Sequence, residues 1–147
     1  MASTPSQGDQ AARQAAAIPF RRDGNRLEFC LVTSIGKGRW GFPKGFVDPG
    51  ETAEESALKE AAEEAGLAGR IEGRPLGSYD YAKWGMLLRV TVFLMRVTGE
   101  KATWEEAALR RRRWCGADEA GNLLGRRELR DLLATAIERL SVGQAEE

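Results

Sequence analysis

The sequence predicts an α/β fold in which a mixed β-sheet carries helices packed on its faces. Three observations support this prediction. Several segments are rich in apolar and β-branched residues, as strands are. A helix with its own start and stop signals is expected over 52–65, between these segments. A second, amphipathic helix is expected over 127–140, near the end of the chain.

The length and composition are those of one folded domain. The chain has 147 residues, 42% of them hydrophobic and 30% charged, which excludes a disordered or fibrous protein. We expect the domain to cover 15–142, with small, polar tails at 1–14 and 143–147. No apolar run has the length of a signal peptide or a membrane span. We therefore expect a cytoplasmic protein that does not enter a membrane.

Six extended segments are expected around the two helices. A turn at 22–25 separates the first two, and the long segment near the middle is strongly β-branched. The expected strands, in chain order, are Ala15–Phe20, Leu27–Ser34, a short piece at Trp40–Pro43, Arg70–Tyr79, Leu87–Val97 and Leu109–Cys115.

The sequence contains a start signal and a stop signal for the helix expected over 52–65. Thr52 followed by Glu55 is a capping-box pattern, and Gly66 is suited to the left-handed position that ends a helix. Its apolar residues are mostly alanines, which would let it approach the sheet closely. The later helix places Leu129, Leu132, Leu133, Ala136, Ile137 and Leu140 on one side.

The residue types that are missing narrow the chemistry. The chain has no histidine, which excludes Ser-His-Asp and Cys-His catalysis and a His-ligated zinc site. Cys30 and Cys115 are far apart and form no CxxC pair, so we expect two reduced core thiols. Any reaction must therefore use carboxylates, Lys or Arg, hydroxyls, backbone groups, or a hard metal ion held by oxygen.

The net charge of zero conceals an uneven distribution. The segment 45–67 holds seven acidic residues and one basic residue, so it carries minus six and the remainder carries plus six. A neutral chain argues against a nucleic-acid ligand. An acidic segment within a basic frame is the arrangement expected where a bound cation meets an anionic substrate.

Glu60, Glu63 and Glu64 share one face of the expected helix, because they are spaced by three and four residues. One interpretation is a solvated acidic surface, which is the usual meaning of glutamates on a helix. The other is a site for Mg²⁺ or Mn²⁺, hard cations that take oxygen ligands and attract phosphate groups.

The surrounding pattern resembles the Nudix box, the hallmark of the Nudix hydrolases. From Gly45 to Leu67 the chain reads Gly-x5-Glu-x7-Lys-Glu-Ala-x-Glu-Glu-x-Gly-Leu. Lys59 stands where the family has Arg, and Ala61 is smaller than the usual aliphatic residue; the other specified positions match. The preceding segment, 39–45, also resembles the Trp-x-x-Pro-x-Gly lead-in of members that act on dinucleoside or diphosphoinositol polyphosphates.

The resemblance implies a Nudix-type α/β/α sandwich and the hydrolysis of a pyrophosphate bond with a divalent metal. It implies that Glu63 and Glu64 hold Mg²⁺ or Mn²⁺, and that Glu60 is a further ligand or the base that activates water. Glu51 would orient or assist the catalytic groups, and Gly45 would offer its backbone carbonyl to the metal. A metal held by carboxylates can neutralise charge and align water without histidine.

Lysine in place of arginine at position 59 is expected to affect how firmly the nearby glutamates are held rather than the reaction itself. Lysine can pair with Glu55 or Glu63 one turn away, but it is a point charge without the planar fork of arginine. We expect weaker pre-organisation and a functional site.

Residues outside the box are candidates of a second kind. Some family members supply another catalytic glutamate from a later loop, and Glu105 and Glu106 lie in a suitable stretch. The alternative interpretation for each of these candidates is a solvated, core or rim residue without a functional role. The candidates for substrate binding are Arg39, Lys44, Arg89, Tyr81 and Trp84, with Tyr79 as another aromatic that could stack on a base. The run 110–113 would alternate faces in a strand, so at most half of it can face one site.

The leading hypothesis is a Mg²⁺-dependent pyrophosphohydrolase acting on a small polyphosphate of the dinucleoside or diphosphoinositol type. The alternatives within the family are hydrolysis of ADP-ribose, a sugar nucleotide or a nucleoside triphosphate. A non-catalytic nucleotide-binding module is a further alternative. The resemblance also allows a homodimer, although no segment identifies an interface.

Overall fold

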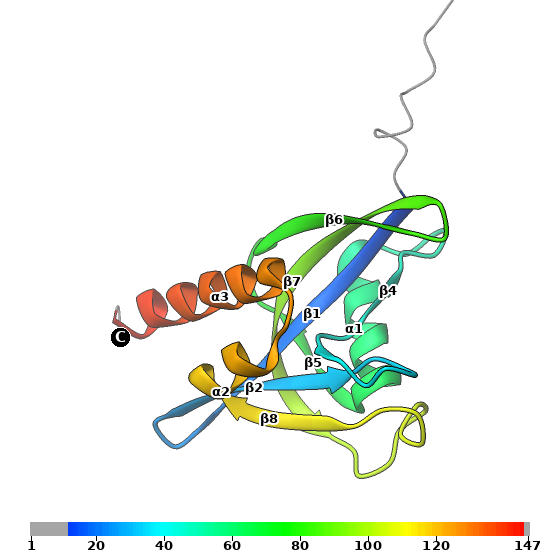
Figure 1. The fold of residues 1–147 in the computed structure, drawn as a ribbon. Helices are drawn as coiled ribbons and strands as arrows, with labels where there is room; N and C mark the ends of the chain where they lie inside the picture. The colour runs from blue at the N-terminus through cyan, green and yellow to red at the C-terminus, as the bar shows by residue number, and fades with distance from the viewer. Residues whose placement is uncertain (1–11, 146–147) are drawn as a thin grey trace, which may run out of the picture.

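A mixed β-sheet lies between helices in the computed structural model, which describes residues 12–145 (Figure 1). The strands are β1 (Ala12–Asp23), β2 (Arg26–Thr33), β3 (Trp40–Gly41), β4 (Lys44–Phe46), β5 (Leu67–Ile71), β6 (Gly77–Lys83), β7 (Met86–Glu100) and β8 (Arg112–Gly116). The helices are α1 (Ala53–Ala65), α2 (Ala117–Leu123) and α3 (Arg127–Ala145).

The two long strands β1 and β7 form the centre of the sheet and run parallel to each other, from Ala12 opposite Leu88 to Phe20 opposite Arg96. On its other edge, each of these two strands pairs antiparallel with one strand along its first half and with another strand along its second half. β1 pairs first with β4 and then with β2, and β7 pairs first with β6 and then with β5. The sheet therefore forks on both sides, and the short strand β4 brings residues 44–46 beside β1.

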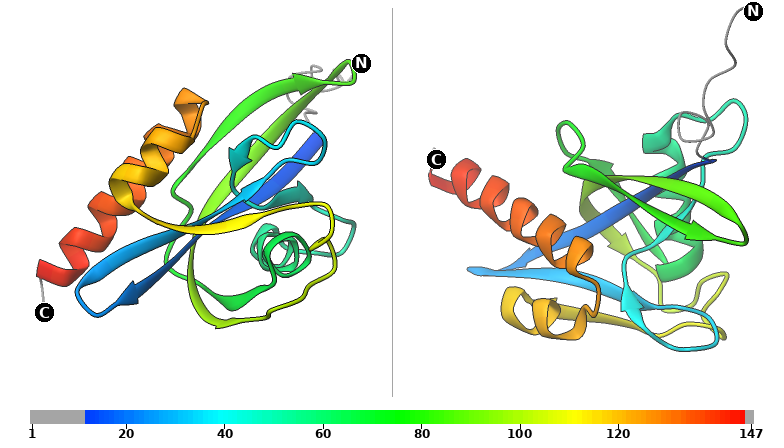
Figure 2. Two further views of the ribbon diagram at one scale, coloured as in Figure 1. Left: turned by 60° about the horizontal axis from the view of Figure 1, so that its bottom comes forward. Right: turned by 45° about the horizontal axis from the view of Figure 1, so that its top comes forward.

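The alternation of side chains along β1 divides the core into two layers, because successive residues of a strand point to opposite faces. Ala15 and Ala17 pack with Ala57 and Ala61 of α1 on one face. The even-numbered residues from Ala16 to Phe20 join a larger cluster on the other face, with residues of α2 and α3. Figure 2 shows α1 and α3 on opposite sides of the sheet. The predicted α/β/α sandwich is confirmed.

The ends of α1 match their sequence signals. The Thr52 side chain accepts a hydrogen bond from the Glu55 amide at 3.1 Å, and the Glu55 carboxylate accepts one from the Thr52 amide at 2.8 Å. Gly66 ends the helix in the left-handed region with φ +68°. A side chain there would meet the Arg112 guanidinium at 2.8 Å and the Trp104 ring at about 3 Å, so glycine suits both the backbone and the packing.

Several predicted boundaries were wrong. The strand expected over 70–79 is divided into β5 and β6 by the connection at 72–76, which contains Gly73 and Pro75. The last strand begins at Arg112 rather than Leu109, and α2 was not predicted, because a helix of seven residues shows little periodicity. Residues 12–14 belong to β1, and α3 continues to Ala145. Residues 1–11 and 146–147, from the two predicted tails, lie outside the described residues.

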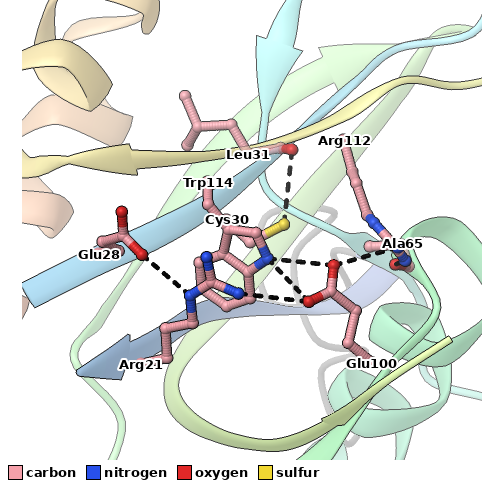
Figure 3. A network of polar contacts seen from close by, with 8 residues as sticks. All are labelled: Arg21, Glu28, Cys30, Leu31, Ala65, Glu100, Arg112 and Trp114. Carbon is pink, nitrogen blue, oxygen red and sulfur yellow. Dashed lines mark hydrogen bonds and ion pairs between the residues drawn. The ribbon is translucent and has the colours of Figure 1, made fainter. Parts of the chain in front are cut away.

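A network of charged and aromatic side chains joins four strands on the α1 face (Figure 3). Arg21 of β1 pairs with Glu28 and Glu100 and lies over the Trp114 ring at 4.0 Å. Arg112 pairs with Glu100 at 3.1 Å. Within the arginine run at 110–113, only Arg112 and Arg113 belong to a strand. Arg112 joins this network, whereas Arg113 pairs with Glu119 of α2.

Candidate active site

A cleft of about 660 Å³ opens where α1, β4, β6 and the start of α3 converge. Its walls are rich in cations. The basic residues that line it are Lys37, Arg39, Lys44, Lys83, Arg110 and Arg126. Glu64 is the one carboxylate among the lining residues that the structure describes. The cleft therefore suits a ligand with several negative charges, with one acidic group on its wall.

Glu64 is buried against β4 and a distant arginine. Its side chain is 7% exposed; Oε1 accepts a hydrogen bond from the Lys44 amide at 3.2 Å, and Oε2 lies 3.3 Å from Arg110 Nη2. Burial raises the pKa of Glu64 to about 8, against the opposing effect of Arg110. A bound cation would stabilise the ionised form of this carboxylate, which burial has deprived of hydration.

Glu60, one turn before Glu64 on α1, lies against Gly45 of β4. A Cβ atom at position 45 would stand 2.3 Å from the Glu60 carboxyl carbon, so only glycine leaves room for this carboxylate. Burial, and then the charge of Glu63, raise the pKa of Glu60 to about 7. The glycine and the glutamate that the box spaces fifteen positions apart are thus in direct contact.

Glu63 meets the two glutamates of the later loop. Carboxylate oxygens of Glu63, Glu105 and Glu106 all lie within 4.8 Å of one another. Desolvation, and then the charge of Glu105, raise the pKa of Glu63. Glu105 and Glu106, which were expected as further catalytic residues, thus lie beside the box residue Glu63. Their catalytic role stays a prediction.

The segment that carries Glu105 and Glu106 is fixed to the end of α1, where helix carbonyls lack partners within the helix. The Glu106 amide donates to the Glu63 carbonyl at 3.1 Å. The Trp104 indole donates to the Glu64 carbonyl and Arg112 donates to the Ala65 carbonyl, both at 2.8 Å. The same contacts that complete the helix end place the two loop glutamates beside Glu63.

Glu51 is held apart from this cluster by a network of its own. Its Oε1 accepts hydrogen bonds from Ser56 Oγ at 2.8 Å and from Lys59 Nζ at 3.0 Å. Lys59 also donates to Asp48 at 2.7 Å. The expected partners of Lys59 were wrong: Glu55 is occupied by the capping box, and the lysine reaches Asp48 and Glu51 in the preceding loop.

The donor set fits a hard divalent cation. Glu63, Glu105 and Glu106 lie close enough together to share a cation, and Glu60 and Glu64 are their neighbours on α1; these five residues are the carboxylate cluster. Desolvation disfavours the negative charge of the three on α1. The backbone adds a further oxygen on the same side. The Gly45 carbonyl was expected to bind the metal, and this stays a prediction. Gly45 pairs with Ala15 in the sheet, whereas the Lys44 amide donates to Glu64, so the Lys44 carbonyl, on the same side of the strand as that amide, is a second backbone candidate.

Tyr81 forms part of the wall of the cleft. Lys44 Nζ donates to the Tyr81 hydroxyl at 2.8 Å, and this hydroxyl donates to Gln14 Oε1 at 2.8 Å. Arg126 lies about 5 Å from the rings of Tyr79 and Tyr81. The aromatic wall therefore carries cations that are available to phosphate groups.

The NUDIX domain family model matches residues 11–136, which include all of these groups. The chain belongs to the Nudix hydrolase family. Curated relatives agree. The chain is 36% identical over 134 residues to Nudix hydrolase 18, mitochondrial, of Arabidopsis thaliana, covering 85% of this chain and 76% of that protein. It is 39% identical over 93 residues to Nudix hydrolase 4 of the same plant, covering 61% of this chain and 44% of that protein.

Proteins whose names include a substrate or a ligand are also similar to this Nudix chain. The asymmetrical bis(5'-nucleosyl)-tetraphosphatase of Sus scrofa is 35% identical over 138 residues, covering 84% of this chain and 91% of that protein. The crystal structure of a C. elegans Ap4A hydrolase has the same fold, with a TM-score of 0.75 and 23% identity over 88% of this chain and 98% of that one. The NUDIX domain of Shewanella oneidensis NrtR, crystallised with ADP ribose, gives a TM-score of 0.72 at 19% identity, over 95% of this chain and 94% of that one.

Two of the predicted binding residues lie away from the Nudix cleft. Arg89 pairs with Asp80 at 2.9 Å on the face of β7 opposite to Val90, and it does not line the cleft. Trp84 is 68% exposed at the turn between β6 and β7, with φ +55°. Arg39, Lys44 and Tyr81 do line the cleft.

Sequence reasoning missed Arg110 and three further cations of the cleft. Lys37 stands in a glycine-rich loop, Lys83 ends β6, and Arg126 precedes α3. These four residues lie in loops or at the ends of elements, and a single sequence does not show where such positions lie in space. Among residues 12–145, no helix has the length and hydropathy of a membrane span.

Proposed function

We propose that this chain is a divalent-metal-dependent pyrophosphohydrolase that cleaves a small polyphosphate. The observation that carries the proposal is the meeting of acidic and basic groups: Glu64 lines a cleft with six basic residues, and further glutamates gather beside it. Pyrophosphate hydrolysis requires neutralised phosphate oxygens and an aligned water, and this arrangement supplies both kinds of group.

Each carboxylate has a proposed role. Glu60, Glu63 and Glu64 would hold Mg²⁺ or Mn²⁺, with the backbone carbonyl of Gly45 or of Lys44 as a further oxygen ligand. The metal would supply positive charge at the phosphate oxygens and a more acidic bound water. Glu60 or Glu106 would accept the proton of the attacking water. Glu51 would position the helix through Ser56 and Lys59, since these are its contacts.

The leading substrates are dinucleoside polyphosphates and diphosphoinositol polyphosphates. The lead-in segment 39–45, the basic cleft and the similarity to a bis(5'-nucleosyl)-tetraphosphatase support them. ADP-ribose is a second candidate, because a NUDIX domain of the same fold was crystallised with it. ADP-ribose has a single pyrophosphate linkage and therefore carries fewer negative charges than the six cations of the cleft would neutralise.

A substrate panel tests the proposal. The purified chain is incubated with diadenosine tetraphosphate, a diphosphoinositol polyphosphate, ADP-ribose, a sugar nucleotide and ATP, each with Mg²⁺ or Mn²⁺. Mass spectrometry in ¹⁸O-labelled water identifies the product and the phosphorus that was attacked. We expect metal-dependent cleavage, fastest for one of the first two compounds. No turnover of any compound, together with metal-free nucleotide binding, would favour a binding module.

Two accompanying proposals concern the cell and the assembly. Both cysteines are free and buried, which supports a reducing compartment such as the cytoplasm. A homodimer stays a prediction from the family resemblance, and sedimentation of the purified chain would test it.

A further inference from the structure

Arg110 is the cation that the carboxylate cluster already holds. Its Nε donates to Glu106 Oε1 at 2.6 Å, and its Nη2 donates to Glu64 Oε2 at 3.3 Å. Its Nη1 donates to the Thr33 carbonyl at 3.0 Å, which anchors the guanidinium at the end of β2. One side chain thus joins the box helix, the later loop and the sheet.

These contacts are well shielded from water. The side chains of Arg110, Glu64 and Glu106 are 14%, 7% and 24% exposed, respectively. Among the described residues, Arg110 makes all of the ion pairs to the five glutamates of the cluster. Removing one partner from such a buried pair leaves an uncompensated charge, so the cluster needs Arg110 or another cation in its place.

A divalent cation on the same carboxylates would lie within a few ångströms of the guanidinium. The two positive groups would repel each other strongly in this poorly solvated region. Arg110 has space to move into, because its side chain also lines the cleft. Because Arg110 can turn from the carboxylates toward the cleft, a metal ion could take its place on the carboxylates.

We propose that Arg110 and the divalent cation compete for Glu64 and Glu106, so that the guanidinium leaves these carboxylates when the metal site fills. Arg110 is then a positioning residue that holds the carboxylates in place until the ion arrives. The inference rests on the metal site of the proposed function, but it concerns metal binding alone and needs no substrate.

The direct test follows the Arg110 side chain by NMR in the unaltered protein. The ¹⁵Nε–H signal of Arg110, assigned by its loss in Arg110→Lys, which keeps the positive charge, is expected to exchange slowly with water in the metal-free protein. Titration with Mg²⁺ should shift this signal and speed its exchange, in step with the backbone amides of Glu63 and Glu64. A signal that keeps its shift and exchange rate while those amides saturate overturns the inference. If the amides do not respond to Mg²⁺ or Mn²⁺ either, the metal site of the proposed function fails as well.

Mn²⁺ affinity, measured by electron paramagnetic resonance without substrate at pH 8, gives a second test. Loss of the competing charge in Arg110→Met should tighten Mn²⁺ binding by about tenfold, and Arg110→Lys should fall between the two. Arg113→Gln is the matched control, since Arg113 pairs with Glu119 on the surface of the same segment, and it should bind Mn²⁺ like the unaltered chain. Unchanged or weaker binding in a folded Arg110→Met overturns the inference; if this variant does not fold, the NMR titration of the unaltered protein decides.

Discussion

Lys59 Nζ lies 2.7 Å from Asp48 Oδ2, across the loop that precedes the box helix. The same ammonium lies 3.0 Å from Glu51 Oε1, so the lysine has two acidic partners in that loop. These contacts raise the pKa of Lys59, the hydrogen bond to Asp48 being the larger cause. Asp48 thus supplies a second anchor for a side chain that lacks the planar fork of arginine.

This arrangement predicts that Asp48 matters only while position 59 is a lysine. Asp48→Asn should lower kcat by about two- to fivefold in the native background, because exposed ion pairs contribute modestly. In a Lys59→Arg background the same change should have little effect, since the guanidinium can grip Glu51 by two hydrogen bonds. Turnover of the four proteins of this cycle gives the coupling. Equal losses in both backgrounds would show that Asp48 acts elsewhere.

Glu64→Gln is expected to abolish most of the activity while leaving the fold intact. The amide keeps the shape of the side chain but removes a charge from the proposed metal site, which should reduce turnover roughly a hundredfold or more. Isothermal titration with Mg²⁺ should show weaker binding, and thermal melting should show a stable protein. Glu54→Gln on the exposed first turn of the same helix is the control and should retain turnover. Near-normal activity in Glu64→Gln would remove Glu64 from the site.

Gly45→Ala tests the contact between the loop and Glu60. The added methyl group would overlap the Glu60 carboxylate, which is the mobile end of a side chain and can move aside. We expect turnover and Mg²⁺ affinity to fall by tenfold or more, while the melting temperature changes little. Gly121→Ala, where the added atom meets nothing within 4 Å, is the control for a glycine-to-alanine change. A large loss of stability in Gly45→Ala with full activity per folded molecule would contradict this reading.

The sequence identified the box helix well because its signals are local. Thr52, Glu55 and Gly66 act within one turn of their partners, and the spacing of Glu60, Glu63 and Glu64 fixes a shared face. The partner of Lys59 was missed, since helix periodicity favours a neighbour one turn away and does not show how the preceding loop folds back.

The remainder of the site depends on contacts between distant segments. Glu105 and Glu106 could be proposed from the resemblance, but their position beside Glu63 depends on Trp104 and Arg112 capping the end of α1. Arg110 belongs to a run of four arginines, in which only the alternation of faces was predictable. Which of these faces meets the carboxylates follows from the pairing of β8 with β2, and pairing between strands is not a local property of the sequence.

The metal-free protein should lose stability as the pH rises from 5.5 to 8. Burial raises the pKa values of Glu60 and Glu64 from 4.5 to about 7 and about 8, so the folded state binds more protons than the unfolded state in this range. A raised carboxyl pKa contributes stability below the unfolded value, and that contribution is lost as the pH rises through the folded value. The lowered pKa values of Glu51, Glu72 and Asp80 act below 4.5 and leave this window unaffected.

Thermal melting in EDTA at several pH values measures the slope. The melting temperature should fall toward pH 8 in the unaltered chain, and it should fall less in Glu64→Gln, which has no proton to lose at that position. Saturating Mg²⁺ should restore more stability at pH 8 than at pH 5.5, because it binds the ionised carboxylates and offsets their mutual repulsion. A melting temperature that rises with pH in EDTA would show that these carboxylates are already ionised and compensated without a metal.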